Sequence, residues 1–184
     1  HYPPEKVKFI IYDSKYVDYT IFNSLPHLIM PVITDARKAA DAILWLSFEC
    51  RKRLKLLADS SAKDIVAYNK QCTASGSEKL PHLFVILDDF SSVQVDPDTT
   101  VSLMDVLKNG RPVGIHFILA TSLTSSKVLR KDILSNVPCR ISFCVSTKAD
   151  SRVAIEQNGA ENLSVPGELI FKWQNNLVKC QGVY

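Results

Sequence analysis

The sequence of 184 residues lacks several patterns that would each assign it to a class of protein. No stretch approaches the roughly eighteen consecutive apolar residues of a membrane span, and the start, HYPPEKVK, is no signal peptide. The six glycines never cluster, and no GxxxxGK[ST] phosphate-binding loop occurs. Without the amides and lysine of such a loop, we expect the chain by itself to bind a nucleoside triphosphate poorly.

Excess charge and regularly spaced cysteines are also missing. The 22 Lys and Arg residues oppose 19 Asp and Glu residues, and the net charge of +3 excludes nucleic-acid binding through bulk charge. The five cysteines show no CxxC spacing, so we expect a reduced compartment. His27, His82 and His116 each stand alone beside apolar residues, where a histidine usually packs or caps rather than ligates.

What the sequence does contain is enough apolar material for one core. The hydrophobic content is 46%, and residues 1–184 are expected to form a single domain. The chain passes from Pro3 and Pro4 straight into an apolar strand, with His1 in place of an initiating Met. We therefore expect a piece of a longer protein.

Short apolar runs alternate along the chain with stretches of helical periodicity. Strands that are apolar on both faces and separated by helices predict an α/β fold with a mostly parallel sheet and helices on both faces. A C-terminal β-hairpin with its turn at Asn175-Asn176 follows, and residues 73–79 are expected to be a flexible loop. The predicted strands are residues 7–12, 83–87, 115–120, 139–145, 167–173 and 177–183, and the predicted helices are residues 35–58, 99–109, 126–134 and 149–158.

The sharpest local pattern is HLFVILDDF, in which Asp88 and Asp89 end a buried strand. A rigid strand can hold one carboxylate where it orients Mg²⁺ through water, while the second positions an attacking water. Strands of open α/β sheets also end in Asp to turn a loop or cap a helix, so this pattern alone leaves both interpretations open.

Two further strand ends are predicted at the same edge of the sheet. Asp13 and Lys15 follow the first strand, and the carboxyl ends of parallel strands are where such sheets bind ligands. Thr121 and Ser122 follow the third strand and either hydrogen-bond a γ-phosphate or its attacking water, or cap the next turn. The basic run at 50–55, CRKRLK, is either a nucleic-acid patch or the solvated face of a helix.

Seven sequence segments, in this order along the chain, together resemble one known family. They are FIIYDSK, LPHLIMPVITDARKAADAILWLSFECRKRLKLL, AYN at 67–69, LPHLFVILDDF, GRPVGIHFILATS, NVPCRISFCVSTKADSR and EQNGAENL. Over nearly its whole length the chain resembles the motor domain of FtsK/SpoIIIE DNA translocases. The resemblance implies a RecA-like ATPase that uses ATP and Mg²⁺ and encircles double-stranded DNA as a homo-hexamer. It also implies a cytoplasmic location at the inner face of the cell membrane, an anchor outside this chain, and an N-terminal truncation that removes the Walker A strand and loop.

The resemblance also implies roles for single residues. Asp88 matches the Walker B Asp of the family, and Asp89 stands where the family usually has Glu. Asp13 and Lys15 match the acid and lysine of an IDPK-like strand end. Arg111 matches an arginine that reaches the nucleotide of the neighbouring subunit.

The remaining matches are arginines in the second half of the chain. Arg140 matches the RI-F segment, and Arg152 matches the DSR segment, where it contacts the nucleotide or serves as a structural ion-pair partner.

The chain departs from the family pattern near the expected chemistry. Ser122 replaces a Gln and Leu123 an Arg. The side chain of Asp89 is one methylene shorter than Glu, and a displacement near 1 Å can cost about a hundredfold in rate. The segment at 91–100, SSVQVDPDTT, lacks the lysines common in the pore-lining region.

Two functions fit these observations. The chain is either part of an ATP-driven translocase of double-stranded DNA in chromosome segregation, cell division or DNA transfer, or a catalytically degenerate domain. In the second case it serves assembly or regulation in a conjugation or secretion apparatus. A GxxxxGK[ST] motif encoded before His1 would favour the first function, and the 184 residues alone are expected to be inactive as an ATPase.

Overall fold

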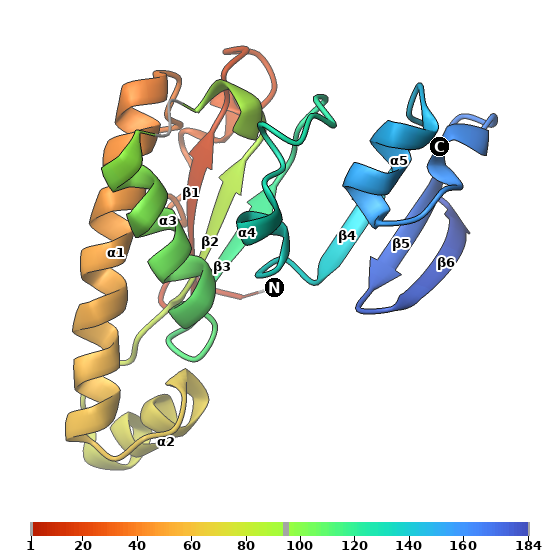
Figure 1. Cartoon of the computed structure of the whole chain (residues 1–184). Coiled ribbons are helices and arrows are strands. Elements are labelled where there is room, and N and C mark those ends of the chain that lie inside the picture. Colours follow the sequence, from red (N-terminus) through yellow and green to blue (C-terminus); the bar gives the residue numbers. More distant parts are fainter. Residues whose placement is uncertain (1, 94–95, 184) are drawn as a thin grey trace. The chain divides into compact units, whose positions relative to one another are not determined.

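The computed structural model describes residues 2–93 and 96–183. The chain folds into two compact units, residues 1–121 and 122–184 (Figure 1). The α/β class is confirmed, because a parallel three-stranded sheet with helices forms the first unit and the second ends in an antiparallel hairpin. No helix in the described part of the chain is long and apolar enough to cross a membrane.

The first unit is built on three parallel strands in the order β1-β2-β3. These strands are β1 (Val7–Tyr12), β2 (His82–Leu87) and β3 (Ile115–Leu119), as the apolar runs predict. Tyr12 pairs with Leu87, and Leu87 pairs with Leu119, so all three strands end at one edge. This register decides which side chains meet beyond the strands.

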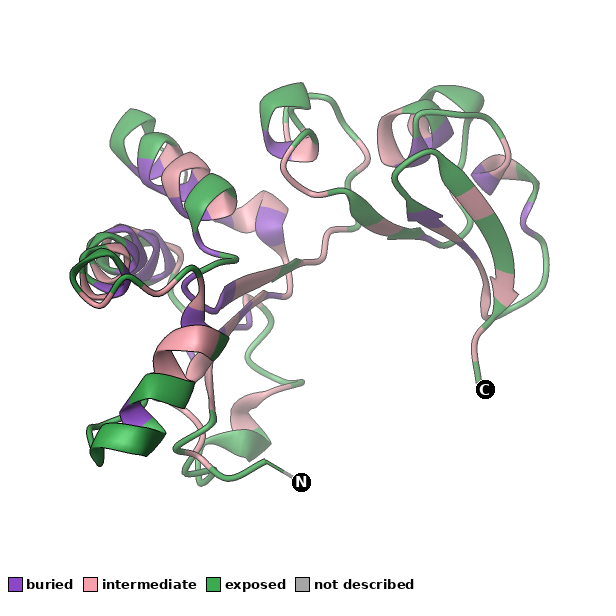
Figure 2. Cartoon of the chain, turned by 90° about the horizontal axis from the view of Figure 1, so that it is seen from below, coloured by how far each residue is buried: buried purple, intermediate pink, exposed green. Residues whose placement is uncertain are grey.

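Helices α1 (Ala36–Asp59) and α3 (Pro97–Asn109) lie on the same face of this sheet (Figure 1). Both belong to connections that step from one parallel strand to the next in the same direction, and right-handed crossovers then place both helices on one side. Asp35 caps α1 by accepting the backbone N–H groups of Arg37 and Lys38, both at 3.0 Å. The two helices turn their buried residues inward (Figure 2); those of α1 are Ala39, Ala40, Ala42, Ile43, Leu46, Ser47, Cys50, Arg53 and Leu57.

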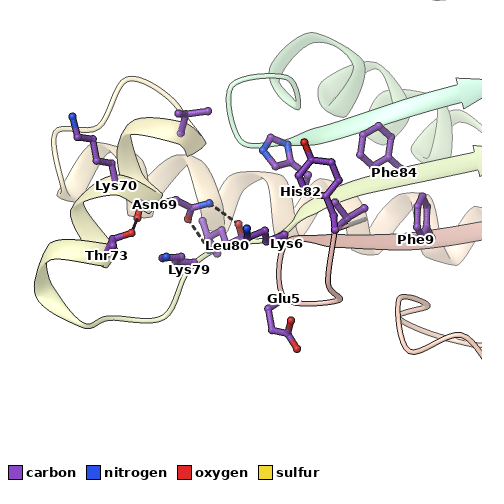
Figure 3. Close-up of a pocket in the computed structure, with 13 residues that line it drawn as sticks. Glu5, Lys6, Phe9, Asn69, Lys70, Thr73, Lys79, Leu80, His82 and Phe84 are labelled. Carbon is purple, nitrogen blue, oxygen red and sulfur yellow. Dashed lines mark hydrogen bonds between the residues drawn. The ribbon is translucent and has the colours of Figure 1, made fainter.

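Helix α2 (Ile65–Ser75) was not predicted, and residues 73–75, expected in a loop, form its last turn. Only two of its residues, Ile65 and Cys72, are buried, so no apolar stripe marks it in the sequence. Gly76, at a φ of 71°, ends the helix in the left-handed conformation that glycine adopts readily. Asn69 fixes the helix to the chain before β2, since its amide exchanges two 2.8 Å hydrogen bonds with the backbone of Leu80 (Figure 3).

The outer edge of β1 is covered by an irregular segment, residues 27–33, that runs parallel to it. Phe9 donates its N–H to the carbonyl of His27 at 2.8 Å, and Ile33 donates to the carbonyl of Ile11 at 2.8 Å. Within the described residues of this unit, β3 has a sheet neighbour on one side only. New strands can therefore join the sheet at β3 but not at β1.

The sheet face opposite α1 and α3 is only partly covered. Along β2, Leu83, Val85 and Leu87 are buried, whereas His82, Phe84 and Ile86 are half-buried. A cavity of about 880 Å³ opens at the amino ends of β1 and β2, between this face and α2 (Figure 3). Its lining is Tyr2, Glu5, Lys6, Val7, Phe9, Val66, Asn69, Lys70, Thr73, Lys79, Leu80, His82 and Phe84.

The second unit holds an antiparallel sheet in the order β4-β5-β6 with a small core of Ile155, Ala160, Leu163 and Ile170. The predicted hairpin is confirmed, but its turn is at Gln174-Asn175, one residue before the predicted position, because Trp173 pairs with Asn176. The elements of this unit are α4 (Lys131–Leu134), β4 (Cys139–Ser142), α5 (Lys148–Ile155), η3 (Ala160–Asn162), β5 (Glu168–Trp173) and β6 (Asn176–Gln181).

Arg140 ties several of these elements together. Its guanidinium donates to the carbonyls of Val137, Ala154 and Leu134, and to the carboxylate of Glu156 at 3.1 Å. Lys172 also donates to Glu156, at 2.8 Å, and these two cations hold the pKa of Glu156 below its usual value. Arg140 thus serves the fold of this unit.

Candidate functional site

Acidic and polar residues gather at the carboxyl edge of the parallel sheet. Asp13 follows β1, Asp88 and Asp89 follow β2, and Thr121 comes two residues after β3. Asp88 donates its N–H to the carbonyl of Tyr12 at 3.1 Å, which continues the ladder one residue beyond the strands. The parallel register therefore brings these residues to one edge, as the sequence predicts.

Asp13 is fully buried and organises the loop that follows β1. Its carboxylate accepts the backbone N–H groups of Lys15 at 2.9 Å and of Asp18 and Tyr19 at 3.1 Å. Burial alone raises the pKa of Asp13, but these amide hydrogen bonds outweigh it and hold the pKa below the usual value. A buried, ionised carboxylate with backbone donors makes a rigid centre for the loop.

The loop carries a third carboxylate back to the edge. Oxygens of Asp13, Asp18 and Asp88 all lie within 4.8 Å of one another. Asp18 was missed in the sequence because it lies five residues beyond Asp13, outside any strand. Oxygen ligands of this kind are those that Mg²⁺ takes, so the donor set fits a magnesium ion.

Tyr19 borders the same group of acids. Burial raises the pKa of its phenol, and the negative charges of Asp88, Asp18 and Asp13 raise that pKa further. The ring packs at a tilt against Phe22 in the 3-10 helix η1 (Thr20–Phe22), with 6.3 Å between centroids.

Asp89 has different neighbours from Asp88. Its carboxylate accepts the hydroxyl of Ser14 at 3.4 Å and the hydroxyl of Ser91 in η2 (Phe90–Ser92). In the described part of the chain, Asp89 belongs to no group of three possible metal ligands. The two acids thus differ in their surroundings, since Asp88 lies beside carboxylates and Asp89 accepts from hydroxyls.

The other predicted site residues fall in two places. Lys15 is exposed at the acidic edge. Arg111 lies in the turn before β3, at the opposite end of the sheet, roughly 17 Å from Asp88 by the rise of five strand residues. Arg111 therefore does not contact the acids of its own chain.

Ser122 and Arg152 belong to the second unit, as the unit boundaries place them. Arg152 donates its Nε–H to the side-chain oxygen of Asn158 at 2.9 Å, a link between α5 and the segment after it. Of the segment at 91–100, Gln94 and Val95 lie outside the described residues.

The histidines that looked solitary in the sequence include a pair. Nδ1 of His82 lies 3.2 Å from Nε2 of His116, and the rings stack with centroids 5.4 Å apart. The register of β2 and β3, in which Phe84 pairs with His116, brings them together. This pair lies among the amino-end residues of the sheet, away from the acids.

Comparison with known proteins gives a consistent result. The profile of the FtsK/SpoIIIE family matches residues 1–162. The DNA translocase FtsK of Clostridium tetani is 35% identical over 188 residues, covering 100% of this chain and 25% of the relative. The DNA translocase SftA of Bacillus subtilis is 40% identical over 172 residues, covering 91% of this chain and 18% of the relative. The chain thus spans a quarter or less of the length of these curated relatives.

Solved structures resemble the chain as well. The pCW3 conjugation coupling protein TcpA, in its monomer form with ATPgS, has a TM-score of 0.80 at 24% identity and covers 97% of this chain and 52% of its own. The cytoplasmic domain of the Thermomonospora curvata type VII secretion ATPase EccC has a TM-score of 0.78 at 21% identity, covering 98% of this chain and 22% of its own. At such identities the likeness establishes a shared fold.

Proposed function

Because the chain belongs to the FtsK/SpoIIIE family, we propose that it is the acidic-edge, Walker B part of the motor of an ATP-driven double-stranded DNA translocase. The observation that carries this proposal is the convergence of Asp13, Asp18 and Asp88 at the carboxyl edge of a parallel sheet. Ligands bind at that edge in open α/β sheets. On the ground of family membership, we propose that the complete protein moves DNA in chromosome segregation, cell division or DNA transfer.

Each residue at the edge has a distinct proposed role. Asp88 would orient Mg²⁺ through water, and Asp89 would position the water that attacks the γ-phosphate. Asp13 holds the loop that carries Lys15, and Lys15 and Thr121 face the phosphates. Bound Mg²⁺ and ATP would supply the charge and the phosphoryl group on which these side chains act.

The topology supports a phosphate-binding strand beside β3. The edge of β1 is already covered by residues 27–33, so a further strand joins at β3. A right-handed crossover from such a strand back to β1 steps in the reverse direction and places its helix on the opposite face from α1 and α3. That is the half-buried face, and the cavity of Figure 3 lies against it at the amino ends of β1 and β2.

The position of Arg111 supports a proposal about assembly. This residue lies at the far end of the sheet from Asp88, which supports the role that the family resemblance implies, contact with the nucleotide of a neighbouring subunit. We propose a homo-hexamer around double-stranded DNA, held at the cytoplasmic face of the membrane by segments beyond residues 1–184.

The second candidate, a catalytically degenerate domain of a conjugation or secretion apparatus, is favoured by Asp89. Its short side chain is already bound to the hydroxyls of Ser14 and Ser91 and would have to leave them to reach a water. Ser122 and Leu123, which replace a Gln and an Arg of the family, point the same way.

ATP hydrolysis by the protein as its gene encodes it, with and without duplex DNA, separates the two functions. We expect hydrolysis stimulated by DNA, and we expect Asp88→Asn to lower it at least about a hundredfold because the magnesium-orienting charge is lost. Asp59→Asn, an equal change at an exposed site on α1, is the control. Equal rates for Asp88→Asn and the unaltered protein exclude Asp88 as the metal-site acid, and no hydrolysis by the unaltered protein favours the degenerate domain.

A further inference from the structure

The cavity at the amino ends of β1 and β2 is separate from the acidic edge, since it lies at the opposite end of the sheet. One wall is formed by α2, and the other by β1, β2 and the segments that precede them (Figure 3). The α2 side chains in the lining recur every three to four residues, which places them on one side of the helix; they are Val66, Asn69, Lys70 and Thr73. The volume of about 880 Å³ is that of pockets that hold small molecules.

Apolar side chains face this cavity from both walls. Phe9 and Phe84 pair across β1 and β2, and their ring centroids are 6.0 Å apart (Figure 3). Val7 precedes Phe9 by two residues and so lies on the same face of the strand. On the helix wall, Val66 is 67% exposed. A ligand that covers these side chains removes apolar surface from water, so the cavity favours a ligand with an apolar body.

The uncharged polar side chains that α2 and β2 contribute to the lining already have partners. The amide of Asn69 exchanges two 2.8 Å hydrogen bonds with the backbone before β2, and the hydroxyl of Thr73 donates to the carbonyl of Asn69 at 2.8 Å. Nδ1 of His82 lies 3.2 Å from Nε2 of His116. The backbone of β1 is paired with β2 on one side and with residues 27–33 on the other, so an extended peptide cannot join it. The walls therefore offer a ligand few hydrogen bonds, which again fits an apolar body.

The charges around the cavity are mainly positive. Lys6, Lys70 and Lys79 line it together with one acid, Glu5, and all four residues are exposed. Among the residues that the structure describes, none of these three lysines takes part in an ion pair. Their long, flexible side chains can bring the ammonium groups to an anion at the mouth of the cavity, and the same groups repel a cation.

We propose that this cavity binds a small amphiphilic anion. Its apolar chain or ring system, of about the size of a fatty acid, lies between α2 and the sheet, and its carboxylate or other anionic group lies among Lys6, Lys70 and Lys79. The proposal goes beyond the proposed function and does not rest on it, because the lining includes none of the residues of the acidic edge. The competing occupant is the helix proposed to cover the same face of the sheet.

The first test measures the charge preference of the cavity. The 184-residue chain is titrated by calorimetry with dodecanoate and with dodecyltrimethylammonium, which share a twelve-carbon chain, both below their micelle concentrations. We expect one dodecanoate to bind at least about tenfold more tightly than the cation, because three lysines each contribute a weak attraction. Replacing Lys6, Lys70 and Lys79 by Gln should bring the two affinities within about twofold of each other. The matched control replaces three exposed lysines of α1 by Gln and should keep the preference; these are Lys38, Lys52 and Lys55.

The second test places the bound chain in the cavity. Val66→Trp puts a large ring into the cavity from α2, and we expect it to weaken dodecanoate binding at least about tenfold, since displacing two methylene groups has that effect. Val101→Trp makes the same change on α3, outside the lining, at a residue that is 65% exposed, and should leave binding unchanged. Circular dichroism of both variants checks that they fold.

Three results overturn the proposal. The first is failure of the unaltered chain to bind dodecanoate, or equal affinity for dodecanoate and the cation. The second is equal dodecanoate affinity of Val66→Trp and Val101→Trp, which would place the ligand elsewhere. The third is binding by the 184-residue chain that is absent in the protein as its gene encodes it, which would show that the covering helix fills the cavity. Binding by both forms with the expected preference supports the site, whether or not the protein hydrolyses ATP.

Discussion

Arg53 shows how much a single side chain contributes to the first unit. It is 2% exposed within α1, and its guanidinium donates to the carbonyls of Pro81 at 2.8 Å and Val113 at 3.0 Å and to Glu49 at 2.8 Å. These bonds join α1 to the starts of β2 and β3. The basic run that contains Arg53 is thus not entirely a solvated face, because Arg53 belongs to the core while Arg51, Lys52 and Lys55 are exposed.

We expect Arg53→Met to destabilise the chain by about 3 kcal/mol, because the carbonyls of Pro81 and Val113 and the carboxylate of Glu49 lose their donor. Lys55→Met, at an exposed position of the same helix, should change stability by less than about 0.5 kcal/mol. Urea unfolding monitored by circular dichroism measures both changes. A similar urea midpoint of unfolding for the two variants would show that Arg53 does not contribute to stability.

Some residues at the candidate site could be predicted from the sequence, and others could not. Asp13, Asp88 and Asp89 could be placed because strand ends in register must share an edge. Asp18 and Tyr19 could not, since they reach the acids only through a loop folded around Asp13. Arg53 occupies the buried stripe between Cys50 and Leu57, but its charge made that position resemble the solvated face.

Among the elements, the β5–β6 hairpin is confirmed while its turn sequence is unusual. Gln174 has a φ of 55°, and a residue with a Cβ adopts this left-handed conformation at a cost of about 1 kcal/mol. We therefore expect Gln174→Gly to stabilise the chain by up to about 1 kcal/mol. Thermal unfolding tests this, with Gln157→Gly in the loop after α5 as the control. A lower melting temperature for Gln174→Gly would contradict the strained turn.

Element prediction succeeded where apolar residues form a short continuous run or recur with the period of a helix. All three parallel strands and the long helix α1 have such patterns. Helix α2 does not, because it is fixed by Asn69 and by the hydrogen bond from Ile65 to Pro112 rather than by an apolar stripe. Helix α5 ends at Ile155, before the predicted end at residue 158, because Glu156 turns to a φ of 64° and directs its carboxylate to Arg140 and Lys172.

At the scale of the whole molecule, the His82–His116 pair predicts how stability depends on pH. Burial lowers the pKa of His82, with Arg53 adding to the effect, and burial lowers the pKa of His116, with His82 and Arg111 adding. The folded state therefore favours the neutral rings. This contribution is present above the ordinary pKa of 6.5 and is lost as pH falls below it.

We expect the melting temperature of the 184-residue chain to fall between pH 7 and pH 5.5, and to fall less in His116→Gln. The acids with lowered pKa values, such as Asp13, lose their contribution only at lower pH, outside this window. His27→Gln, at a histidine bound to the carbonyl of Tyr2, is the control. An identical pH profile for His116→Gln and the unaltered chain would refute the role of the pair.

The half-buried sheet face leads us to predict that the 184-residue chain binds an apolar dye. Apolar surface that a helix would cover in a larger fold should bind the dye ANS, so the 184-residue chain should enhance its fluorescence. A longer form of the protein that includes the residues encoded before His1 should enhance it less. Equal enhancement per molecule would contradict a covering helix from that part of the protein.

The segment at 27–33 has a consequence for how copies of the first unit meet. A sheet with two bare sides can grow without limit, because each added copy leaves another side exposed. Here one side is closed by the chain itself, and β3 is the remaining one. In the described part of the 184-residue chain, two copies joined through β3 would use up the last free strand of this sheet, so such pairing stops at a dimer and does not extend into a fibre. In a longer protein, the phosphate-binding strand proposed beside β3 would occupy this side instead.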